Sequence, residues 1–337
     1  MILAGDVGGT KANFALFSRE GKRLAPLWVK SFSSQAFLNL ESLLAELPLD
    51  PKKIACACFG VPGPVICGVA KGCNLAWAAD AAGLRRALGI PSVYVINDLE
   101  AMAYGIAELT ADQFLVLNEG QDRGAATAAL LAAGTGLGEA LLYWDGMRHV
   151  AIPCEGGQAD FAPRNALEFQ LLEYLREKFG HASWERVLSG PGLCNIYSFL
   201  RDGGYGEESA WVREQMRERD PASVIAEAGL GKDCALCARA LELFVSLYGA
   251  EAGNLALRAV AVGGIFIGGG IAAKMASKLA GGGFLEAFLA KGRMAPMLSK
   301  VAVRVILEEK TPMLGAARFA CQQEGSVLAQ AVHAAGG

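Results

Sequence analysis

The stretch Ile2-Leu3-Ala4-Gly5-Asp6-Val7-Gly8-Gly9-Thr10 decides the fold, together with the residues that follow it. An apolar, strand-like run enters a pair of glycines, and Ala12-Asn13-Phe14-Ala15-Leu16-Phe17 then returns to a strand-like pattern. The sequence therefore predicts a β-hairpin with a tight glycine turn. A dinucleotide-binding loop or a Walker-type loop would lead into a helix, so neither of these nucleotide sites is indicated.

The same pattern returns in the segment 125–143. The run Ala128-Ala129-Leu130-Leu131-Ala132-Ala133 enters Gly134-Thr135-Gly136-Leu137-Gly138, and Ala140-Leu141-Leu142-Tyr143-Trp144 continues as a strand. Two strand–glycine turn–strand units suggest two related halves, which we state as a hypothesis of internal duplication.

The rest of the chain has the rhythm of an α/β protein. Apolar strands are expected at 53–59, 92–96, 264–267 and 301–307, and helices at 99–109, 165–179, 271–279 and from Thr311 to about Gln323. The segment 234–257 reads as one long helix or as two, with a break near Gly249 or Gly253. Residues past Gly325 are expected to fray.

Size and composition limit the function classes. The chain has 337 residues, of which 53% are hydrophobic and 19% charged, so two lobes with a large core are expected. The net charge of −3 predicts neither a nucleic-acid partner nor a membrane surface. No signal-peptide pattern precedes the first strand, and an odd count of nine cysteines predicts reduced thiols and a cytoplasmic location. The spacing of Cys234 and Cys237 resembles a metal motif, but buried helical cysteines are the better interpretation.

Seven motifs, in this order, resemble the bacterial glucokinase family, within the superfamily of sugar kinases, actin and related ATPases. They are Gly5–Thr10, Ile96-Asn97-Asp98, Ala133–Gly138, Glu155-Gly156-Gly157, Asp160-Phe161-Ala162-Pro163, Glu185–Gly192 and Gly263–Gly270. The resemblance implies an α/β fold of two actin-like (ribonuclease H-like) lobes with a central ligand cleft. The small lobe would hold residues 1–108, completed by a C-terminal helix at 312–324, and the large lobe would hold 109–311.

The resemblance also implies an activity. It predicts ATP-dependent phosphorylation of a hexose, D-glucose to glucose 6-phosphate, at the start of glycolysis, with ATP and Mg²⁺ as cofactors. The expected partner is a small hexose, with no nucleic acid and no membrane, and the expected assembly is a homodimer.

Glycine-rich segments are expected to bind the nucleotide, because glycine lets backbone N–H groups approach phosphates closely. The expected residues are Gly5, Asp6, Val7, Gly8, Gly9, Thr10, Gly134, Thr135, Gly136, Gly268 and Gly269. Ordinary hairpin turns are the alternative interpretation of the two turns. Asp6 is the candidate Mg²⁺ residue, through water, since Mg²⁺ retains much of its hydration shell; the alternative is a turn aspartate.

Asp98 is the candidate catalytic base. It follows an apolar strand, and ligands of open α/β sheets bind at the carboxyl ends of strands. A carboxylate there can accept the proton of a sugar hydroxyl. Local sequence alone favours another role, the N-cap of a helix beginning at Leu99; the family resemblance favours the base.

Sugar recognition is assigned by the same resemblance to Asn97, Asp98, Glu155 and Glu185, with Asn74 as a further candidate on the small-lobe side. Gln158 stands where the family has a histidine that contacts the sugar. An amide can donate a hydrogen bond but cannot become charged, so the choice of sugar is open at this position. Lys11 and Asn13 also depart from the usual Asn and Arg of the family.

Four alternatives stay open at this stage. They are a kinase for another hexose or an amino-hexose, a non-catalytic sugar-binding protein, an ATPase of the same fold without a sugar site, and a sugar-responsive repressor. The carboxylates at 98, 155 and 185 argue against a plain ATPase. A repressor would carry a DNA-binding helix pair before the first strand and a Cys-rich zinc motif, and neither is predicted.

Overall fold

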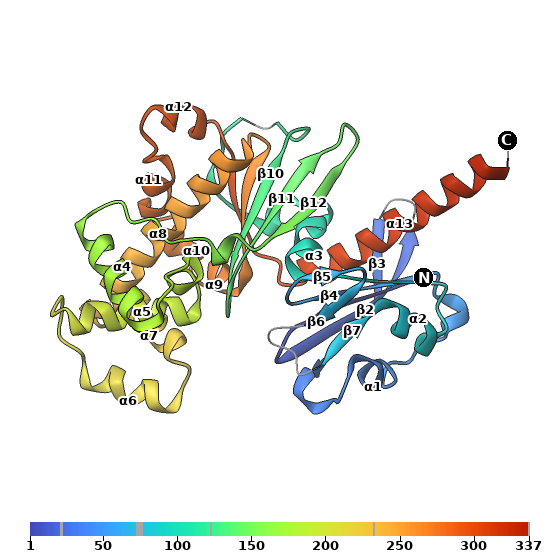
Figure 1. Ribbon diagram of the computed structural model, residues 1–337, viewed down its shortest axis with the longest axis horizontal. Helices are drawn as coiled ribbons and strands as arrows, with labels where there is room; N and C mark the ends of the chain where they lie inside the picture. The colour runs from blue at the N-terminus through green and yellow to red at the C-terminus, as the bar shows by residue number, and fades with distance from the viewer. Residues whose placement is uncertain (21–22, 72–76, 122, 232, 336–337) are drawn as a thin grey trace. The chain divides into compact units, whose positions relative to one another are not determined.

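The computed structural model describes residues 1–20, 23–71, 77–121, 123–231 and 233–335. The chain forms two compact units (Figure 1). Unit 1 comprises Met1–Ala111, Val150–Pro153 and Glu308–Gly337, and unit 2 comprises Asp112–His149 and Cys154–Leu307. Within the described ranges, no helix is long and apolar enough to cross a bilayer.

Unit 1 is built on a five-stranded sheet of order β3-β2-β1-β4-β8. Its strands are β1 (Ile2–Val7), β2 (Lys11–Glu20), β3 (Arg23–Ser33), β4 (Cys56–Val61) and β8 (Ser92–Asn97). β1 is antiparallel to β2, with Val7 opposite Ala12, so the hairpin predicted from the opening sequence is confirmed. β1, β4 and β8 run parallel, which brings their carboxyl ends to one edge of the sheet. A small sheet of β5 (Val65–Ile66), β6 (Val69–Lys71) and β7 (Ala78–Asp80) completes the strands of this unit.

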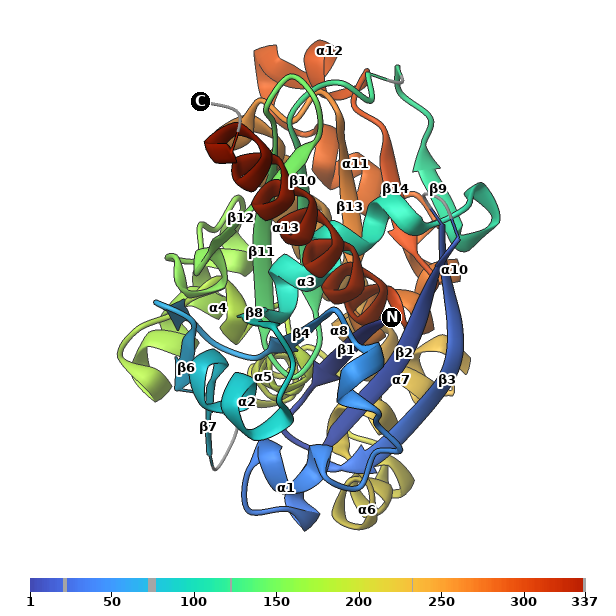
Figure 2. The ribbon, with the colours of Figure 1, turned by 90° about the vertical axis from the view of Figure 1, so that its right-hand side faces the viewer.

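Helices cover both faces of the unit 1 sheet (Figure 2). Alternate strand residues point to opposite faces, so each face has its own core. One core contains Leu3, Phe14 and Phe59 together with α1 (Leu40–Leu44) and α2 (Ala81–Leu88). The other contains Ile2, Cys58 and Ile96 together with α3 (Asp98–Gly105) and α13 (Thr311–Ala335).

Two glycines allow α3 and α13 to pack at close range. A Cβ atom on Gly105 would overlap the carbonyl oxygen of Thr311, and one on Gly315 would overlap that of Ala101. The end expected for this helix, near Gln323, was wrong, since α13 continues to Ala335. No proline interrupts the segment 324–335, and a single glycine inside a helix costs only about 1 kcal/mol.

Unit 2 repeats the plan of unit 1 in a six-stranded sheet of order β12-β11-β10-β13-β14-β9. Its strands are β9 (Phe114–Asn118), β10 (Ala128–Ala133), β11 (Leu137–Trp144), β12 (His149–Cys154), β13 (Gly264–Gly268) and β14 (Val303–Ile306). Of β12, only the end residues His149 and Cys154 belong to unit 2, since Val150–Pro153 are counted with unit 1. β10 and β11 form the second predicted hairpin, with Ala133 opposite Leu137. β10, β13 and β14 are parallel, as β1, β4 and β8 are. The shared strand order supports the hypothesis of duplication.

The helices of unit 2 pack into a large core against this sheet (Figure 1). They are α4 (Ala166–Phe179), α5 (Gly190–Asp202), α6 (Ala210–Glu218), α7 (Pro221–Gly231), α8 (Ala235–Ala259), α9 (Gly269–Lys274), α10 (Ala276–Leu279), α11 (Gly283–Leu289) and α12 (Ala295–Leu298). α8 is one unbroken helix, because its two glycines are packing sites: a Cβ on Gly249 would overlap the carbonyl oxygen of Phe284 on α11. Cys234 caps α8, its sulfur accepting from the N–H of Cys237, and both cysteines are buried at the start of this helix, in line with the expected interpretation.

Candidate active site

The glycine turn of unit 1 joins β1 to β2 with a fixed backbone. The N–H of Gly8 donates to the carbonyl oxygen of Lys11 at 2.9 Å, and the hydroxyl of Ser34 donates to the carbonyl oxygen of Gly8 at 2.6 Å. Thr10 is exposed, while Gly8 and Gly9 are half-buried. The turn thus holds a set shape with its tip toward solvent.

Two residues of the same motif have packing reasons of their own. A Cβ on Gly5 would lie 2.8 Å from ring atoms of Phe14 and of Phe59, so the core requires glycine there. The side chain of Val7 is fully buried in that core. Only the backbone of these two residues remains for contact with a ligand.

Asp6 lies at the carboxyl end of β1, beside this turn. Burial raises the pKa of its carboxyl group from 3.8 to about 6, while a hydrogen bond from Asn13 and the charge of Lys11 act in the opposite direction. Asn13 is itself oriented by Ser31, whose hydroxyl donates to its side-chain oxygen at 2.8 Å. Burial of a carboxylate without a cationic hydrogen-bond partner is costly unless a positive ligand compensates, so Asp6 fits a bound cation.

Asn97 and Asp98 stand at the same edge of the unit 1 sheet. Asp6 pairs with Gly60 on β4, and Gly60 pairs with Ile96 on β8. At a strand spacing of about 4.8 Å, Asp6 and Ile96 are about 10 Å apart. Asp6, the last residue but one of β1, and Asp98, the residue after β8, therefore belong to strand ends two positions apart at one carboxyl edge of the sheet.

Asn97, and not Asp98, is the N-cap of α3. The side-chain oxygen of Asn97 accepts from the N–H of Leu99 at 2.9 Å and of Glu100 at 3.2 Å, and its amide group donates to the carbonyl oxygen of Gly63 at 3.0 Å. The expected alternative, an Asp98 cap on a helix beginning at Leu99, was therefore wrong by one position. Asp98 is the first residue of α3, and its Oδ1 accepts from the N–H of Leu99 at 2.9 Å.

Two further residues shape this corner and were missed by sequence reasoning. Gly60 lets α3 approach the sheet, because a Cβ there would lie 2.9 Å from the Cβ of Ala101 and 3.7 Å from the Cα of Asp98. Glu100 accepts a hydrogen bond from the backbone N–H of Asn97, and burial raises the pKa of its carboxyl group from 4.5 to about 7. The spacing Asn97-x-x-Glu100 is that of a capping box, so this signal could have been read.

The glycine turn of unit 2 lies at the carboxyl end of β10. The N–H of Gly134 donates to the carbonyl oxygen of Gly136 at 2.8 Å, and Thr135 at the tip is exposed. Apart from its two chain neighbours, no heavy atom of the described residues lies within 4 Å of a Cβ built on Gly134, and its φ is not in the left-handed region. Neither packing within the described chain nor backbone conformation requires glycine at 134, so the space beside this residue is open.

Gly268 and Gly269 lie next to this turn. Ala132 on β10 pairs with Gly268 at the end of β13. Gly269 has a φ of +86°, and a Cβ there would overlap the carbonyl oxygen of Ala133. The two glycine segments expected to hold the nucleotide thus sit side by side at the carboxyl ends of neighbouring parallel strands.

Glu155 and Gln158 are exposed in a short 3₁₀ segment that follows β12. The backbone N–H of Gln158 donates to the carbonyl oxygen of Glu155 at 3.0 Å. The intervening Gly156 and Gly157 press against β11, since Cβ atoms there would overlap Glu139 and the carbonyl oxygen of Leu137. The two polar side chains therefore project from a segment whose backbone is tightly seated.

Glu185 contacts the unit 2 turn directly. Its Oε2 atom accepts from the N–H of Leu137 at 3.0 Å. Asn74, the further sugar candidate, lies outside the described residues.

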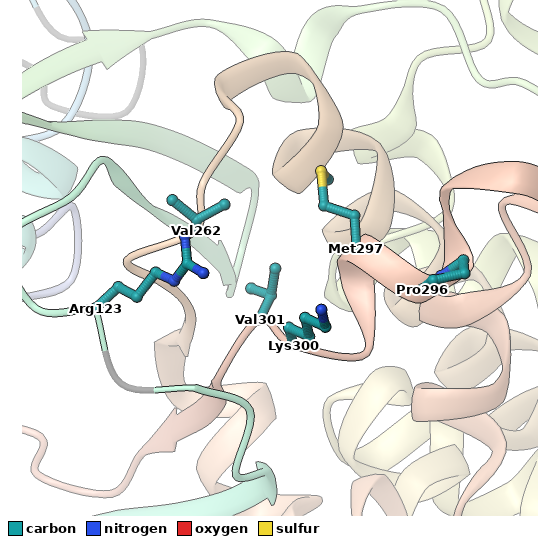
Figure 3. A pocket seen from close by; sticks show the side chains of 6 residues that line it. All are labelled: Arg123, Val262, Pro296, Met297, Lys300 and Val301. Atoms are coloured by element: carbon teal, nitrogen blue, oxygen red, sulfur yellow. The ribbon is translucent and has the colours of Figure 1, made fainter.

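A separate pocket of about 320 Å³ lies elsewhere in unit 2 (Figure 3). Its lining is Arg123, Val262, Pro296, Met297, Lys300 and Val301. Arg123 precedes β10, Val262 precedes β13 and Val301 precedes β14. The pocket therefore lies at the amino ends of these parallel strands, whereas the glycine segments lie at the carboxyl ends of β10 and β13. None of the predicted site residues that the structure describes lines this pocket.

Comparison with known proteins gives a consistent result. A family model described as Glucokinase matches residues 3–323. The chain is 40% identical over 342 residues to a glucokinase of Nostoc punctiforme, with 96% of this chain and 99% of that protein covered. It is 34% identical over 328 residues to a glucokinase of Tolumonas auensis, with 97% and 99% covered.

Solved structures agree. The glucokinase of an Antarctic psychrotroph superposes with a TM-score of 0.82 at 30% identity, over 95% of this chain and 98% of that one. Two more distant structures share the fold. The glucokinase of Balamuthia mandrillaris in complex with glucose has a TM-score of 0.77 at 21% identity, over 95% and 93% of the chains. A ROK family glucokinase of Streptomyces griseus in complex with glucose and AMPPNP has 0.62 at 19%, over 95% and 99%.

Proposed function

Because the chain belongs to the glucokinase family, and so phosphorylates glucose with ATP, we propose that Asp98 is the base that accepts the proton of the sugar hydroxyl. The observation that carries this proposal is the seating of Asp98 at the first position of α3. The Asn97 cap and Gly60 hold the backbone there, and Asp6 lies near the end of β1 at the same sheet edge. A carboxylate at a helix N-terminus is stabilised by the helix dipole.

The chemistry of the step follows from these positions. As the sugar oxygen forms its bond to the γ-phosphorus, its proton passes to a carboxylate oxygen of Asp98. The bond between the γ-phosphorus and the bridging oxygen breaks, and ADP leaves with the electron pair. Phosphoryl transfer depends mainly on positioning and on stabilising negative charge, so a single oriented base is sufficient.

The glycine segments supply the second requirement, which is to hold phosphate charge. Our candidates for this task are the Gly8–Thr10 turn in unit 1 and the Gly134–Gly136 turn in unit 2. Because the N–H groups of Gly8 and Gly134 donate within their own turns, we assign the phosphate contacts to the N–H groups of Gly9, Thr10, Thr135 and Gly136. The open space beside Gly134 supports the proposal, since a phosphate can reach the backbone there. The adjoining Gly268–Gly269 segment is our candidate for the adenosine.

We assign Mg²⁺ to Asp6, which would hold it through water. The residues fit, since Mg²⁺ in kinases needs only one or two carboxylates in addition to phosphate oxygens. When bound, Mg²⁺ offsets negative charge on the phosphates. Asn13 and Lys11 contribute by favouring the charged form of Asp6.

The sugar hydroxyls are assigned to Glu155, Gln158 and Glu185 in unit 2 and to Asn97 and Asp98 in unit 1. The side-chain oxygen of Asn97 accepts the two hydrogen bonds of the helix cap, and one N–H of its amide group donates to Gly63. The second N–H of this amide group is our candidate donor to a sugar oxygen. Another hexose or an amino-hexose is the second candidate substrate, favoured only by the amide at 158. We further infer a cytoplasmic enzyme of early glycolysis; each of the eight described cysteines is a free thiol.

The test combines a substrate panel with one variant. A coupled assay at fixed ATP and Mg²⁺ should give a higher kcat/KM for glucose than for mannose, fructose or glucosamine. Asp98→Asn should lose nearly all turnover while its glucose Kd, measured by calorimetry, changes little. Substantial turnover in Asp98→Asn would show that Asp98 is not the base. A higher kcat/KM for glucosamine than for glucose would make the amino-hexose the preferred substrate.

A further inference from the structure

The glycine turn of unit 2 is held from outside at both of its ends. The carbonyl oxygen of Gly134 accepts from the N–H of Gly190 at 2.9 Å, and the N–H of Leu137 donates to the carboxylate of Glu185 at 3.0 Å. Both partners belong to the segment 185–190, which is 48 residues or more along the chain from the turn. The conformation of the turn therefore depends on that segment.

The Glu185 carboxylate lies directly against the turn. A Cβ atom on Gly136 would stand 2.6 Å from its Oε2. Glycine at 136 is thus explained by the carboxylate, whereas no packing contact among the described residues requires glycine at 134. Oε2 is engaged with Leu137, so Oε1 is the oxygen available for a sugar hydroxyl.

The backbone of Glu185 is also held in place, and its neighbour Trp184 contacts the chain just after the segment Glu155–Gln158. The hydroxyl of Ser189 donates to the carbonyl oxygen of Glu185 at 2.8 Å. Its neighbour Trp184 is fully buried, and the N–H of Trp184 donates to the carbonyl oxygen of Ala159 at 3.0 Å, one residue after Gln158.

The two peptide groups of Leu137 connect Glu185 with the segment Glu155–Gln158. Its N–H donates to the Glu185 carboxylate, and its carbonyl oxygen packs against Gly157, which lies in the segment Glu155–Gln158. A shift of the Glu155–Gln158 segment or of Glu185 would therefore be felt at the end of the glycine turn, because close-packed contacts transmit displacement.

We propose that Glu185, besides contacting the sugar, is a positioning residue for the phosphate-binding turn at Gly134–Gly136, and that it couples sugar binding to nucleotide binding. This inference rests on the assignment of that turn to phosphate. Ordering of the carboxylate by a sugar hydroxyl on Oε1 strengthens its hold on Leu137 through Oε2. Linkage requires that nucleotide then increases sugar affinity by the same factor.

The experiment measures the Kd of AMPPNP with Mg²⁺, with and without saturating glucose, by calorimetry. Without glucose, Glu185→Ala should weaken AMPPNP binding roughly tenfold, as expected for loss of a hydrogen bond to a charged group. Glu185→Gln keeps an oxygen acceptor for Leu137 and should restore most of that affinity while still weakening glucose binding. Glu155→Gln, the matched control, should weaken glucose binding and leave the AMPPNP Kd without sugar unchanged.

Gly136→Ala provides a second route, since it displaces the carboxylate without removing it and should also weaken AMPPNP binding. Equal AMPPNP affinities in wild type, Glu185→Ala and Gly136→Ala, with each protein folded by circular dichroism, would overturn the inference. If the wild-type enzyme phosphorylates glucose and the three proteins still bind AMPPNP equally, the positioning role of Glu185 is refuted and the proposed function stands. A wild type that does not bind AMPPNP refutes the phosphate assignment itself.

Discussion

Asn97 and Glu100 are hydrogen-bonded to each other in both directions across the first turn of α3. The side-chain oxygen of Asn97 accepts from the N–H of Glu100 at 3.2 Å, and the carboxylate of Glu100 accepts from the N–H of Asn97. Asp98 lies between the two in the sequence. The proposed base is therefore fixed by a reciprocal cap on both sides of its peptide unit.

Removal of the Glu100 carboxylate should affect turnover as well as stability. Glu100→Ala leaves the N–H of Asn97 without this partner and should lower the free energy of unfolding by about 1 kcal/mol. Since Asp98 loses part of its support, kcat should fall several-fold while the KM for ATP stays close to wild type. Urea unfolding and steady-state kinetics check both effects; an unchanged kcat would show that the cap does not position Asp98.

Glu100→Gln separates the hydrogen bond from the charge. The pKa of Glu100 is raised by burial to about 7, so the folded protein favours the neutral carboxyl group. That contribution to stability is complete below the ordinary pKa of 4.5 and is lost as the pH rises through about 7. Glu100→Gln should match wild type in acid and exceed its stability at about pH 8. A constant difference in unfolding free energy across this pH range would contradict the assignment.

Asp6 should make the Mg²⁺ requirement depend on pH. Its pKa of about 6 means that protons compete with the cation as the pH falls below that value. The Mg²⁺ concentration for half-maximal rate should therefore rise on going from about pH 7.5 to about pH 5.5, more steeply than in Asp6→Asn. Mg²⁺ titrations of the rate at each pH, with folding checked by circular dichroism, measure this. A half-saturating concentration that is the same at both pH values counts against Asp6.

The predictable parts of the fold are those that depend only on residues close together in the sequence. Apolar runs on either side of glycine gave both hairpins, and the end of β8 gave the position of Asn97 and Asp98 at a strand edge. The choice between Asn97 and Asp98 as the cap required reading the Glu100 partner as well. Local propensity at 97 and 98 is nearly equal, so the capping box decides.

The parts that were not predictable depend on contacts between distant segments. Gly249 suggested a break in a long helix, yet it is where α11 meets an unbroken α8. Glu185 was identified only as a sugar residue, because its bond to Leu137 joins positions far apart in the sequence. Periodicity and spacing carry no information on such pairs.

Gln158 offers a direct test of how the enzyme recognises its sugar. It projects from the seated 3₁₀ segment and is exposed, so replacement should not disturb the core. Gln158→His should lower the KM for glucose several-fold with little change in kcat. The KM should also become pH-dependent near the histidine pKa of about 6.5, a signature that an amide lacks. An unchanged or raised KM at every pH would show that Gln158 already serves the sugar as well as a histidine.

Gly134 and Gly136 occupy one turn but should respond differently to the same substitution. A methyl group on Gly134 meets no atom within 4 Å in the part of the chain that the structure describes, its two neighbours in sequence aside. Gly134→Ala should therefore keep the Tm of wild type and weaken ATP binding by obstructing the approach of the nucleotide. A methyl group on Gly136 meets the Glu185 carboxylate at 2.6 Å, so Gly136→Ala should both lower the Tm and weaken ATP binding. Gly180→Ala, at a φ of +76° beyond the end of α4, is the control that should lower the Tm and leave the ATP KM unchanged. Thermal scans and KM values for the three variants separate a glycine required by the ligand from one required by the fold. If Gly134→Ala retains the wild-type KM for ATP, then the empty space beside this residue is not where the phosphates bind.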